Sequence, residues 1–417
     1  MLTLTPAAAV GLDAARLANI GPHLDRYVDE GKLPGYMVMV ARRGRPAYLH
    51  MNGLRDVERG LPVQEDTIFR IYSMTKPITS VALLQLYEKG LFQLDNPASR
   101  FIPAFKNLQV YAGSDNAGGD GDNLPTVAPE REVTIRDLFT HTAGFTYGNN
   151  DAHPVERLYQ QRHMREGSLA DMVQKLSTVP LLFAPGTRWN YSFATDILGH
   201  LVEVISGQTL DAYFAEHIFA PLGMVDTGFH VPAAKQARFA ANYGPAVAAD
   251  AKSGTPASGL RLIDDPTTST YRQSPMWLSG GGGLVSTCAD YFRFAQMLLN
   301  KGELDGVRII GRKTVELMTT NHMPNNGDLA SMGVPVFSET TYSGIGFGLG
   351  VSVMLNPAKA QILGSPGEYA WGGAASTAFW VDPVEEQIVI FLTQLMPSST
   401  YPLRRELRVL TYGAIVD

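Results

Sequence analysis

Residues 69–80 join a strand-like apolar run to a helix, and this junction constrains the fold more than any other stretch. The downstream half carries apolar side chains at the three- and four-residue spacing of a helix. These apolar positions are Ile78, Val81, Leu84 and Leu86. The spacing predicts a helix that begins near Ser73 and stops at Gly90, a residue type that suits a helix end.

Ser73 and Lys76 lie three residues apart at the start of this helix, so their side chains share one helix face. A serine hydroxyl is a weak nucleophile and needs a neighbour to take its proton. A lysine amine can take it when burial or a nearby cation lowers its pKa. The helix N-terminus also favours the developing negative charge. Because a serine at a helix start is more often only an N-cap, the nucleophile hypothesis needs further motifs.

Two further motifs follow in the chain, Tyr191-Ser192-Phe193 and Trp371-Gly372-Gly373. The order Ser-x-x-Lys, Tyr-Ser-x, Trp-Gly-Gly resembles the family VIII carboxylesterases, which are similar to class C β-lactamases and to penicillin-binding DD-peptidases. The stretches at residues 141–145 and 281–287 resemble the same superfamily. The resemblance runs from about residue 35 to about residue 393, and each motif is a hypothesis that its structural context must support.

The resemblance implies an α+β fold of the β-lactamase and DD-peptidase type, an α/β sandwich with an antiparallel sheet flanked by helices. Both chain ends, residues 1–85 and 278–417, are expected to form the discontinuous sheet domain. Residues 86–277 are expected to form an inserted, mostly helical domain with long loops. The active site is expected in the cleft between the two domains, a common place for pockets.

The resemblance also assigns the site residues. Ser73, Lys76 and Tyr191 are expected to act together in acyl transfer, with the Lys76 ammonium stabilising the Tyr191 phenolate as a base. The backbone N–H groups of Ser73 and Ala374 are expected to form the oxyanion hole. The residues expected to contact the substrate are Tyr72, Phe193, Trp371, Gly372 and Gly373.

Departures from the β-lactamase pattern separate the close relatives. A Tyr-x-Asn motif becomes Tyr191-Ser192-Phe193, so the amide that would contact a β-lactam side chain is missing. A Lys-Thr-Gly motif becomes Trp371-Gly372-Gly373, which replaces the cation for the antibiotic carboxylate by an apolar ring. We therefore expect a carboxylesterase for short- to medium-chain neutral esters, with weak β-lactam hydrolysis. A class C-like β-lactamase, an acyltransferase and a catalytically silent binding protein remain the alternatives.

Other enzyme classes find little support in the sequence. The chain has no Gly-x-Ser-x-Gly pentapeptide, which disfavours an α/β-hydrolase with a Ser-His-Asp triad. His141 could act as a general base, but the resemblance favours a structural role at the floor of the site. We expect no metal ion and no cofactor, because the chain lacks His-Glu-x-x-His and a Gly-Lys-Ser/Thr phosphate loop.

Composition limits the partners. The net charge of −6 comes without a basic stripe, so nucleic acid is not an expected partner. No run reaches the roughly 20 apolar residues of a membrane span, and no secretory signal begins this numbering. One cysteine can form no internal disulfide, which is compatible with a reducing compartment. We expect a cytoplasmic enzyme that acts on a small ester without membrane binding.

Three polar or Gly- and Pro-bearing stretches are expected to be loops, and two of them carry further interpretations. Residues 112–124 are rich in Gly and Asp but lack the closing Glu of a calcium loop, so a mobile loop is expected. Residues 244–276 are expected to be a long irregular excursion at the rim of the cleft. The third loop covers residues 321–346.

Overall fold

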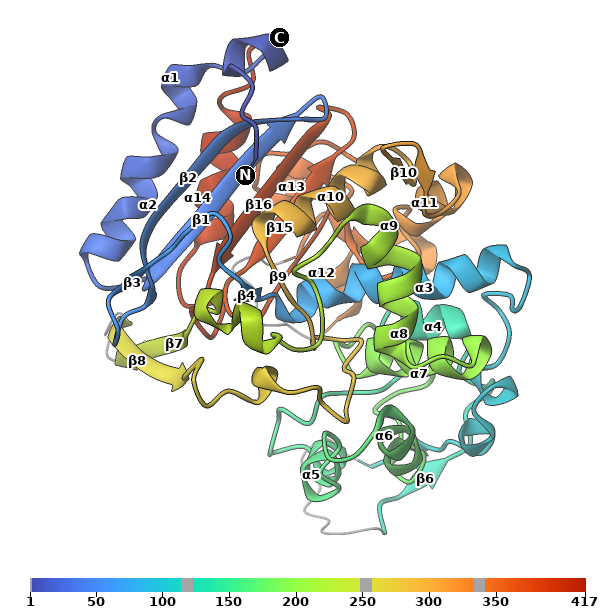
Figure 1. Ribbon diagram of the computed structural model, residues 1–417. Helices are drawn as coiled ribbons and strands as arrows, with labels where there is room; N and C mark the ends of the chain where they lie inside the picture. The colour runs from blue at the N-terminus through green and yellow to red at the C-terminus, as the bar shows by residue number, and fades with distance from the viewer. Residues whose placement is uncertain (1, 114–122, 248–256, 334–341) are drawn as a thin grey trace.

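A sheet of eight antiparallel strands combines both ends of the chain (Figure 1). The computed structural model describes residues 2–113, 123–247, 257–333 and 342–417. The strands lie in the order β12-β13-β14-β15-β16-β1-β2-β3, so the N-terminal strand β1 pairs with the C-terminal strand β16. Their bounds are β1 (Gly35–Arg42), β2 (Arg45–Asp56), β3 (Leu61–Pro62), β12 (Ile345–Phe347), β13 (Ser352–Met354), β14 (Tyr369–Gly372), β15 (Ala378–Asp382) and β16 (Gln387–Thr393).

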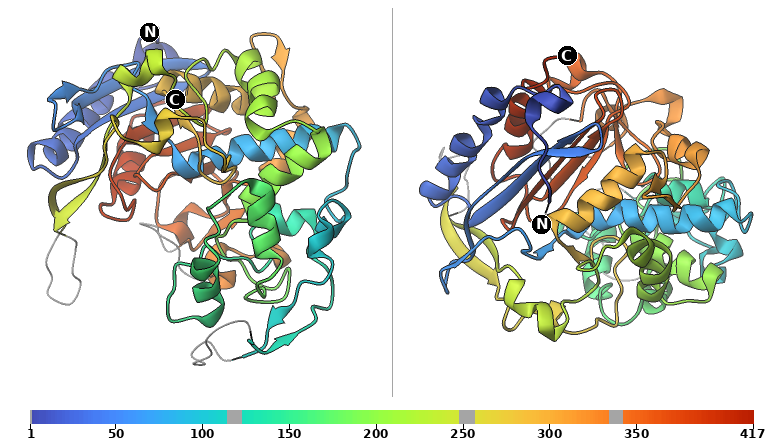
Figure 2. Two further views of the ribbon diagram at one scale, coloured as in Figure 1. Left: turned by 60° about the horizontal axis from the view of Figure 1, so that its bottom comes forward. Right: turned by 45° about the horizontal axis from the view of Figure 1, so that its top comes forward.

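Side chains of the central strands alternate between two cores, as the pleat of a strand requires. Met37 and Met39 of β1 face the larger core, whereas Val38 and Val40 face the smaller one. Helix α10 (Cys288–Leu299) packs on the first face. Figure 2 shows α1 (Ala14–Leu17), α2 (Ile20–Asp29) and α14 (Leu403–Tyr412) over the other face. This arrangement confirms the expected sheet flanked by helices.

The middle of the chain is mostly helical and lies below the sheet in Figure 1. Its helices are α3 (Thr75–Glu88), α4 (Ile135–Phe139), α5 (Pro154–Gln161), α6 (Leu169–Leu176), α7 (Ala194–Ser206), α8 (Leu210–Phe214) and α9 (Ala220–Leu222). The later part adds α11 (Arg312–Met318), α12 (Leu329–Met332) and α13 (Pro357–Ala360). The proposed domain boundaries at residues 85 and 278 remain a prediction.

Helix α3 begins where the sequence predicted. A single 3-10 turn, Tyr72–Met74, leads directly into α3, and nearly all residues of that helix are buried. The helix ends at Glu88, and Gly90 adopts a left-handed conformation with φ of 73°, as the predicted stop requires. Helix α7 packs against α3 and stops at Gly207, which is also left-handed.

Four short pairs of strands connect other parts of the described chain. Strand β4 (Phe69–Arg70), which precedes the 3-10 turn, pairs with β9 (Val285–Ser286). This pairing holds the start of α3 beside the glycine turn at residues 280–283. The four pairs are β4 (Phe69–Arg70) with β9 (Val285–Ser286), β5 (Val110–Tyr111) with β6 (Thr126–Val127), β7 (Asn242–Val247) with β8 (Ser258–Asp264), and β10 (Glu303–Leu304) with β11 (Val307–Arg308).

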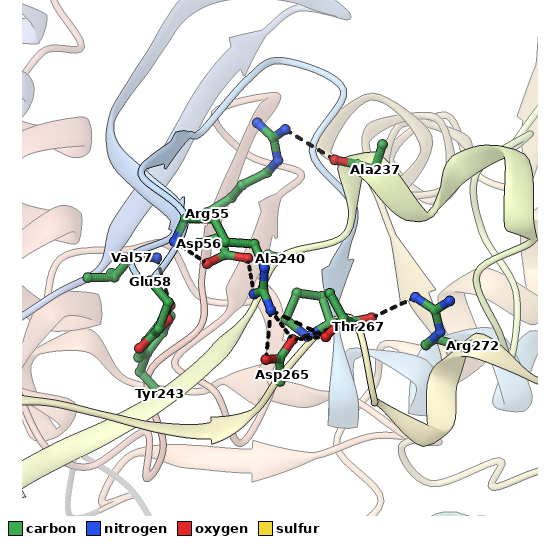
Figure 3. A network of polar contacts seen from close by, with 12 residues as sticks. Arg55, Asp56, Val57, Glu58, Ala237, Ala240, Tyr243, Asp265, Thr267 and Arg272 are labelled. Carbon is green, nitrogen blue, oxygen red and sulfur yellow. Dashed lines mark hydrogen bonds and ion pairs between the residues drawn. The ribbon is translucent and has the colours of Figure 1, made fainter.

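The stretch 244–276, expected to be irregular, contains part of an ordered hairpin instead. Strands β7 and β8 pair antiparallel and attach to the end of β16, where Tyr243 N–H donates to the Gln394 carbonyl at 3.0 Å. Figure 3 shows the Tyr243 hydroxyl between Val57 and Glu58, accepting from the Val57 N–H at 2.7 Å and donating to the Glu58 carboxylate. Contacts with the sheet strands thus give this polar stretch its structure.

The other loop expectations fall partly on residues that the structure does not describe. Residues 114–122 of the Gly- and Asp-rich stretch, residues 248–256 of the stretch 244–276 and residues 334–341 of the stretch 321–346 lie outside the described residues. In the described ranges, none of the helices combines the length and the apolar character needed to cross a membrane.

Arg70 anchors the hairpin from inside the protein. Its side chain is fully buried, and its guanidinium pairs with Asp264 of β8 at 2.5 Å and donates to the Ala240 carbonyl at 2.5 Å. The guanidinium carbon lies 4.0 Å from the centre of the Phe239 ring and 5.4 Å from that of Tyr271. Since Arg70 is three residues before Ser73, this cluster links the hairpin to the start of α3.

Replacing Arg70 by alanine should lower the free energy of unfolding by about 3 kcal/mol, because one partner of a buried ion pair is lost. The Asp264 carboxylate and the Ala240 carbonyl would both lose a charged donor. Urea titration followed by tryptophan fluorescence measures the change. Arg312→Ala, which breaks the exposed pair with Glu316, is the control and should leave stability almost unchanged. Equal losses in both variants would contradict the anchoring role.

Candidate active site

Ser73 and Lys76 meet as the helix geometry predicts. The Lys76 amine lies 3.2 Å from the Ser73 hydroxyl, one turn away along the helix start. The preceding residue, Tyr72, has a φ of 43°, an unusual conformation for a residue with a side chain. Such backbone conformations persist where the surrounding structure enforces them, often at functional sites. The Tyr72 hydroxyl accepts a hydrogen bond from the Asn242 amide at 3.1 Å, which fixes its ring at the cleft.

The Lys76 amine is completely buried and has two further partners. It donates to the Gly281 carbonyl at 2.6 Å and to the Tyr147 hydroxyl at 3.0 Å. Burial lowers the pKa of Lys76 to about 7, although the nearby Asp196 carboxylate opposes this shift. Near neutral pH, a substantial fraction of the amine is therefore unprotonated and able to accept a proton.

Tyr191 reaches the same point from the segment that precedes α7. The Lys76 amine lies 4.5 Å from the centre of its ring, and the Trp371 indole N–H donates to its hydroxyl at 3.0 Å. Burial raises the pKa of the Tyr191 phenol well above its ordinary value, although hydrogen bonds with Ser73 and Trp371 counteract this. The structure therefore favours a neutral phenol at Tyr191 and differs here from the expected phenolate.

Two cavities meet at Ser73. One has a volume of about 430 Å³ and an aromatic wall that includes Tyr72, Tyr271 and Trp277. The other has a volume of about 350 Å³ and runs along the sheet, where Trp371 of β14, Phe379 of β15 and Ile345 of β12 contribute apolar surface. Three of the predicted site residues, Ser73, Tyr191 and Ala374, line both cavities. The geometry offers separate spaces for the two halves of a substrate.

The glycines after Trp371 allow a close approach between the end of β14 and the segment that carries Ser73. A side chain at Gly373 would lie 2.4 Å from the Ile71 carbonyl, and one at Gly372 would lie 2.6 Å from the Arg404 guanidinium. Arg404 donates to the Gly373 carbonyl at 3.2 Å. Both glycines line the second cavity, so the absence of side chains brings backbone groups to the substrate space.

Phe193 is the predicted substrate-contacting residue that the structure does not bring to either cavity. Its ring is 1% exposed and packs against Tyr147, with ring centres 4.7 Å apart. His141 is also buried: its ring nitrogens contact the Ser192 and Thr195 hydroxyls at 3.2 and 3.4 Å. Burial lowers the pKa of His141 well below its ordinary value, in keeping with the structural role expected for it.

Sequence reasoning missed three residues of the site. Tyr147 contacts the Lys76 amine, Trp277 lines the first cavity, and the buried Asp196 lies beside the Gly281 turn. They come from separate elements and share no spacing that a linear pattern could reveal. Among the described ranges, no group of three or more His, Cys, Asp or Glu side chains is placed to hold a metal ion.

Comparison with known proteins places this chain in a family. The model of the Beta-lactamase family matches residues 22–413. A Mycobacterium tuberculosis protein named Protein Rv1367c is 36% identical over 373 residues, which cover 88% of each chain. Esterase EstB of Burkholderia gladioli is 31% identical over 406 residues, which cover 92% of each chain.

A solved structure shares the fold over nearly the full length. The protein described as EstCE1, a hydrolase with promiscuous acyltransferase activity, superposes with a TM-score of 0.75 at 25% identity. The match covers 96% of this chain and 98% of EstCE1. The family model, the two relatives and this fold agree with one another, and the chain belongs to the beta-lactamase family of serine hydrolases, as a homologue of esterases.

Proposed function

We propose that the protein is a serine carboxylesterase of the family VIII type, which hydrolyses short- to medium-chain esters through an acyl-enzyme on Ser73. The observation that carries this proposal is the 3.2 Å contact between the Ser73 hydroxyl and a completely buried lysine amine. A nucleophile within hydrogen-bond reach of a group able to take its proton is the arrangement that covalent catalysis requires.

In the first step, Lys76 acts as the base. An unprotonated amine has two N–H donors and one lone pair, and the site offers three partners. The N–H groups donate to Gly281 and Tyr147, which leaves the lone pair for the Ser73 proton. Ser73 then attacks the ester carbonyl, and its proton moves to Lys76. The pKa of about 7 suits a base that works near neutral pH.

Tyr191 serves as the acid for the leaving group. As a neutral phenol it can donate a proton to the departing alkoxide while the proton on Lys76 replaces it, so that the alcohol leaves neutral. The Trp371 indole N–H holds the phenol oxygen in place. This assignment keeps the Ser-Lys-Tyr set implied by the resemblance and gives the role of principal base to Lys76.

The remaining parts of the proposal concern charge and water. The N–H groups of Ser73 and Ala374 would bind the carbonyl oxygen as it becomes negative, and such donors contribute about 3–4 kcal/mol each. In the second step, water gives a proton to Lys76 as its oxygen attacks the acyl-enzyme. The bond between the acyl carbon and the Ser73 oxygen then breaks, Ser73 takes the proton back from Lys76, and the carboxylic acid is released. The apolar walls around Trp277 and Trp371 favour esters without charge near the reacting bond.

A second candidate function is acyl transfer to an alcohol. The observation that favours it is the pair of cavities that meet at Ser73, because one can hold the acyl group while the other admits an acceptor. EstCE1 is described as having promiscuous acyltransferase activity, and Monacolin J acid methylbutanoyltransferase of Aspergillus terreus is 28% identical over 395 residues. Hydrolysis and transfer share the same acyl-enzyme and differ only in which hydroxyl attacks it.

Substrate preference gives the direct test. Purified protein should cleave p-nitrophenyl acetate, butyrate and octanoate much faster than a chromogenic cephalosporin, because Trp371 occupies the place of the carboxylate-binding cation. Ser73→Ala should remove essentially all ester cleavage, at least a thousandfold in kcat, since the nucleophile is lost. Cephalosporin turnover that matches the esters would instead favour a β-lactamase. Ester cleavage that survives in Ser73→Ala would overturn the assignment.

The pH profile tests the role of Lys76. With a folded pKa of about 7, the amine is protonated at pH 5 and mostly free at pH 8, so kcat/KM should rise with a midpoint near pH 7. Absorbance at a wavelength where nitrophenol and nitrophenolate absorb equally follows the reaction at each pH. Lys76→Arg should be inactive throughout, because guanidinium does not lose its proton. A flat profile between pH 5 and 8 would contradict Lys76 as the base.

Trp371→Phe tests whether the Trp371 indole positions the Tyr191 hydroxyl. The change keeps an aromatic ring in the cavity but removes the N–H that donates to the phenol, and kcat should fall about fivefold, the value of one hydrogen bond near 1 kcal/mol. Trp380→Phe is the matched control, because the Trp380 indole N–H is buried without a partner in the described structure. An unchanged kcat in Trp371→Phe would show that this contact does not position the acid.

A further inference from the structure

Asp196 is a buried carboxylic acid beside the proposed reaction centre. It lies in the first turn of α7 and is 1% exposed, yet it also lines the first cavity. Its Oδ1 accepts hydrogen bonds from the Ser279 hydroxyl at 2.5 Å and from the Gly281 N–H at 3.1 Å. Its Oδ2 is buried without a hydrogen-bond partner in the described structure. Buried carboxyl groups are rarely left half satisfied, so this one calls for an explanation.

The backbone of Gly281 links Asp196 to Lys76. Gly281 donates its N–H to Asp196 and accepts the Lys76 amine on its carbonyl at 2.6 Å. The neighbouring Gly280 carbonyl accepts from the Thr79 hydroxyl at 2.7 Å, so α3 and α7 both hold the turn. A side chain at Gly281 would lie 2.4 Å from the free Oδ2, which shows how closely the carboxyl packs on the glycine backbone. A shift of Asp196 would therefore move the carbonyl that fixes Lys76.

Among the residues that the structure describes, few other charges act on Asp196 and Lys76. The groups that face Lys76 are the Tyr147 and Tyr191 phenols, the His141 ring and the Asp196 carboxyl. Arg165, at the mouth of the cavity, acts on Asp196 from outside. Burial keeps both phenols and the imidazole neutral. Asp196 is thus the group that can supply negative charge to a protonated Lys76.

The charge of Asp196 results from opposing effects. The pKa of the Asp196 carboxyl is raised above its ordinary value, because burial outweighs the Lys76 ammonium and the hydrogen bonds from Ser279 and Gly281, which lower it. The start of α7 also favours a carboxylate in its first turn. When Lys76 accepts the Ser73 proton, the new ammonium in turn stabilises the carboxylate. The pair is therefore suited to bear charge together during the step that needs it.

We propose that Asp196 is a positioning residue of the reaction, which holds the Gly281 carbonyl against Lys76 and stabilises the ammonium that forms when Lys76 takes the Ser73 proton. This inference rests on the proposed function. The proton leaves Ser73 as the oxygen–acyl bond forms, stays on Lys76 while the carboxylate offsets its charge, and passes by way of Tyr191 to the leaving alkoxide. In this proposal Asp196 acts through Lys76 and Gly281, and not on the substrate.

Asp196→Asn is the decisive variant, because asparagine keeps an oxygen for Ser279 and Gly281 but removes the negative charge. Loss of this charge lowers the pKa of Lys76. The rise of kcat/KM with pH, here called the acidic limb, should therefore have its midpoint about one pH unit lower than in the wild-type protein. The maximal kcat should fall about tenfold while KM for p-nitrophenyl butyrate stays the same. A limb at the wild-type position would overturn the proposal, since a purely structural role does not move it.

A second variant keeps the test informative if Asp196→Asn does not fold. Ser279→Ala removes one hydrogen bond that favours the carboxylate, so it should move the limb in the same direction by a smaller amount. An unmoved limb in a folded Ser279→Ala would count against the proposal.

Asp290→Asn is the matched control. Asp290 is also a buried carboxyl in the first turn of a helix, α10, but its partners are the Asp226 N–H and the Thr227 hydroxyl, outside the cleft. This variant should lose stability, but its kcat/KM should rise with pH at the same midpoint as in the wild-type protein. A limb that moved equally in Asp290→Asn would overturn the assignment to Asp196. If the wild-type protein matched Ser73→Ala on the ester, the proposed function itself would fail, which is a distinguishable outcome.

Discussion

The burial of the Lys76 amine is the constraint on which the site depends. An ammonium placed in a protein interior loses hydration, which disfavours its charged form unless opposite charge lies near. Here the amine contacts a backbone carbonyl, two hydroxyl groups and no carboxylate in the described structure. The surrounding glycine turn, the start of α3 and the first turn of α7 all serve to hold this one nitrogen beside Ser73.

The parts of the site that follow from local geometry could be predicted from the sequence. Ser73 and Lys76 lie three positions apart at the start of the helix, so their contact follows from the local geometry alone. Tyr191 and Trp371 came from the resemblance, because nothing local in a tyrosine or a tryptophan reveals a hydrogen bond across the cleft. Tyr147 and Asp196 reach Lys76 only through the packing of separate elements, and no linear spacing carries that information.

Phe193 shows why a motif does not fix every side chain it contains. It lies two residues after Tyr191 and immediately before α7, where the chain turns into the helix. The turn directs the Tyr191 ring toward Trp371 and the Phe193 ring toward Tyr147 and the core. The sheet shows the same limit at larger scale: runs 36–41 and 387–393 predict strands, whereas the β1–β16 pairing joins positions more than 300 residues apart.

The choice between water and an alcohol as the second nucleophile depends on the same cleft. In the proposed acyl-enzyme, the acyl group on Ser73 fills one cavity and the leaving alcohol empties the other. Its apolar wall holds water weakly, so an alcohol with apolar surface can compete although water is far more concentrated. In the proposed mechanism, the base that removes the proton, Lys76, is identical in both reactions. The balance between hydrolysis and transfer is therefore set by the walls of the cleft, where Trp277 and Trp371 lie, and not by the reacting residues.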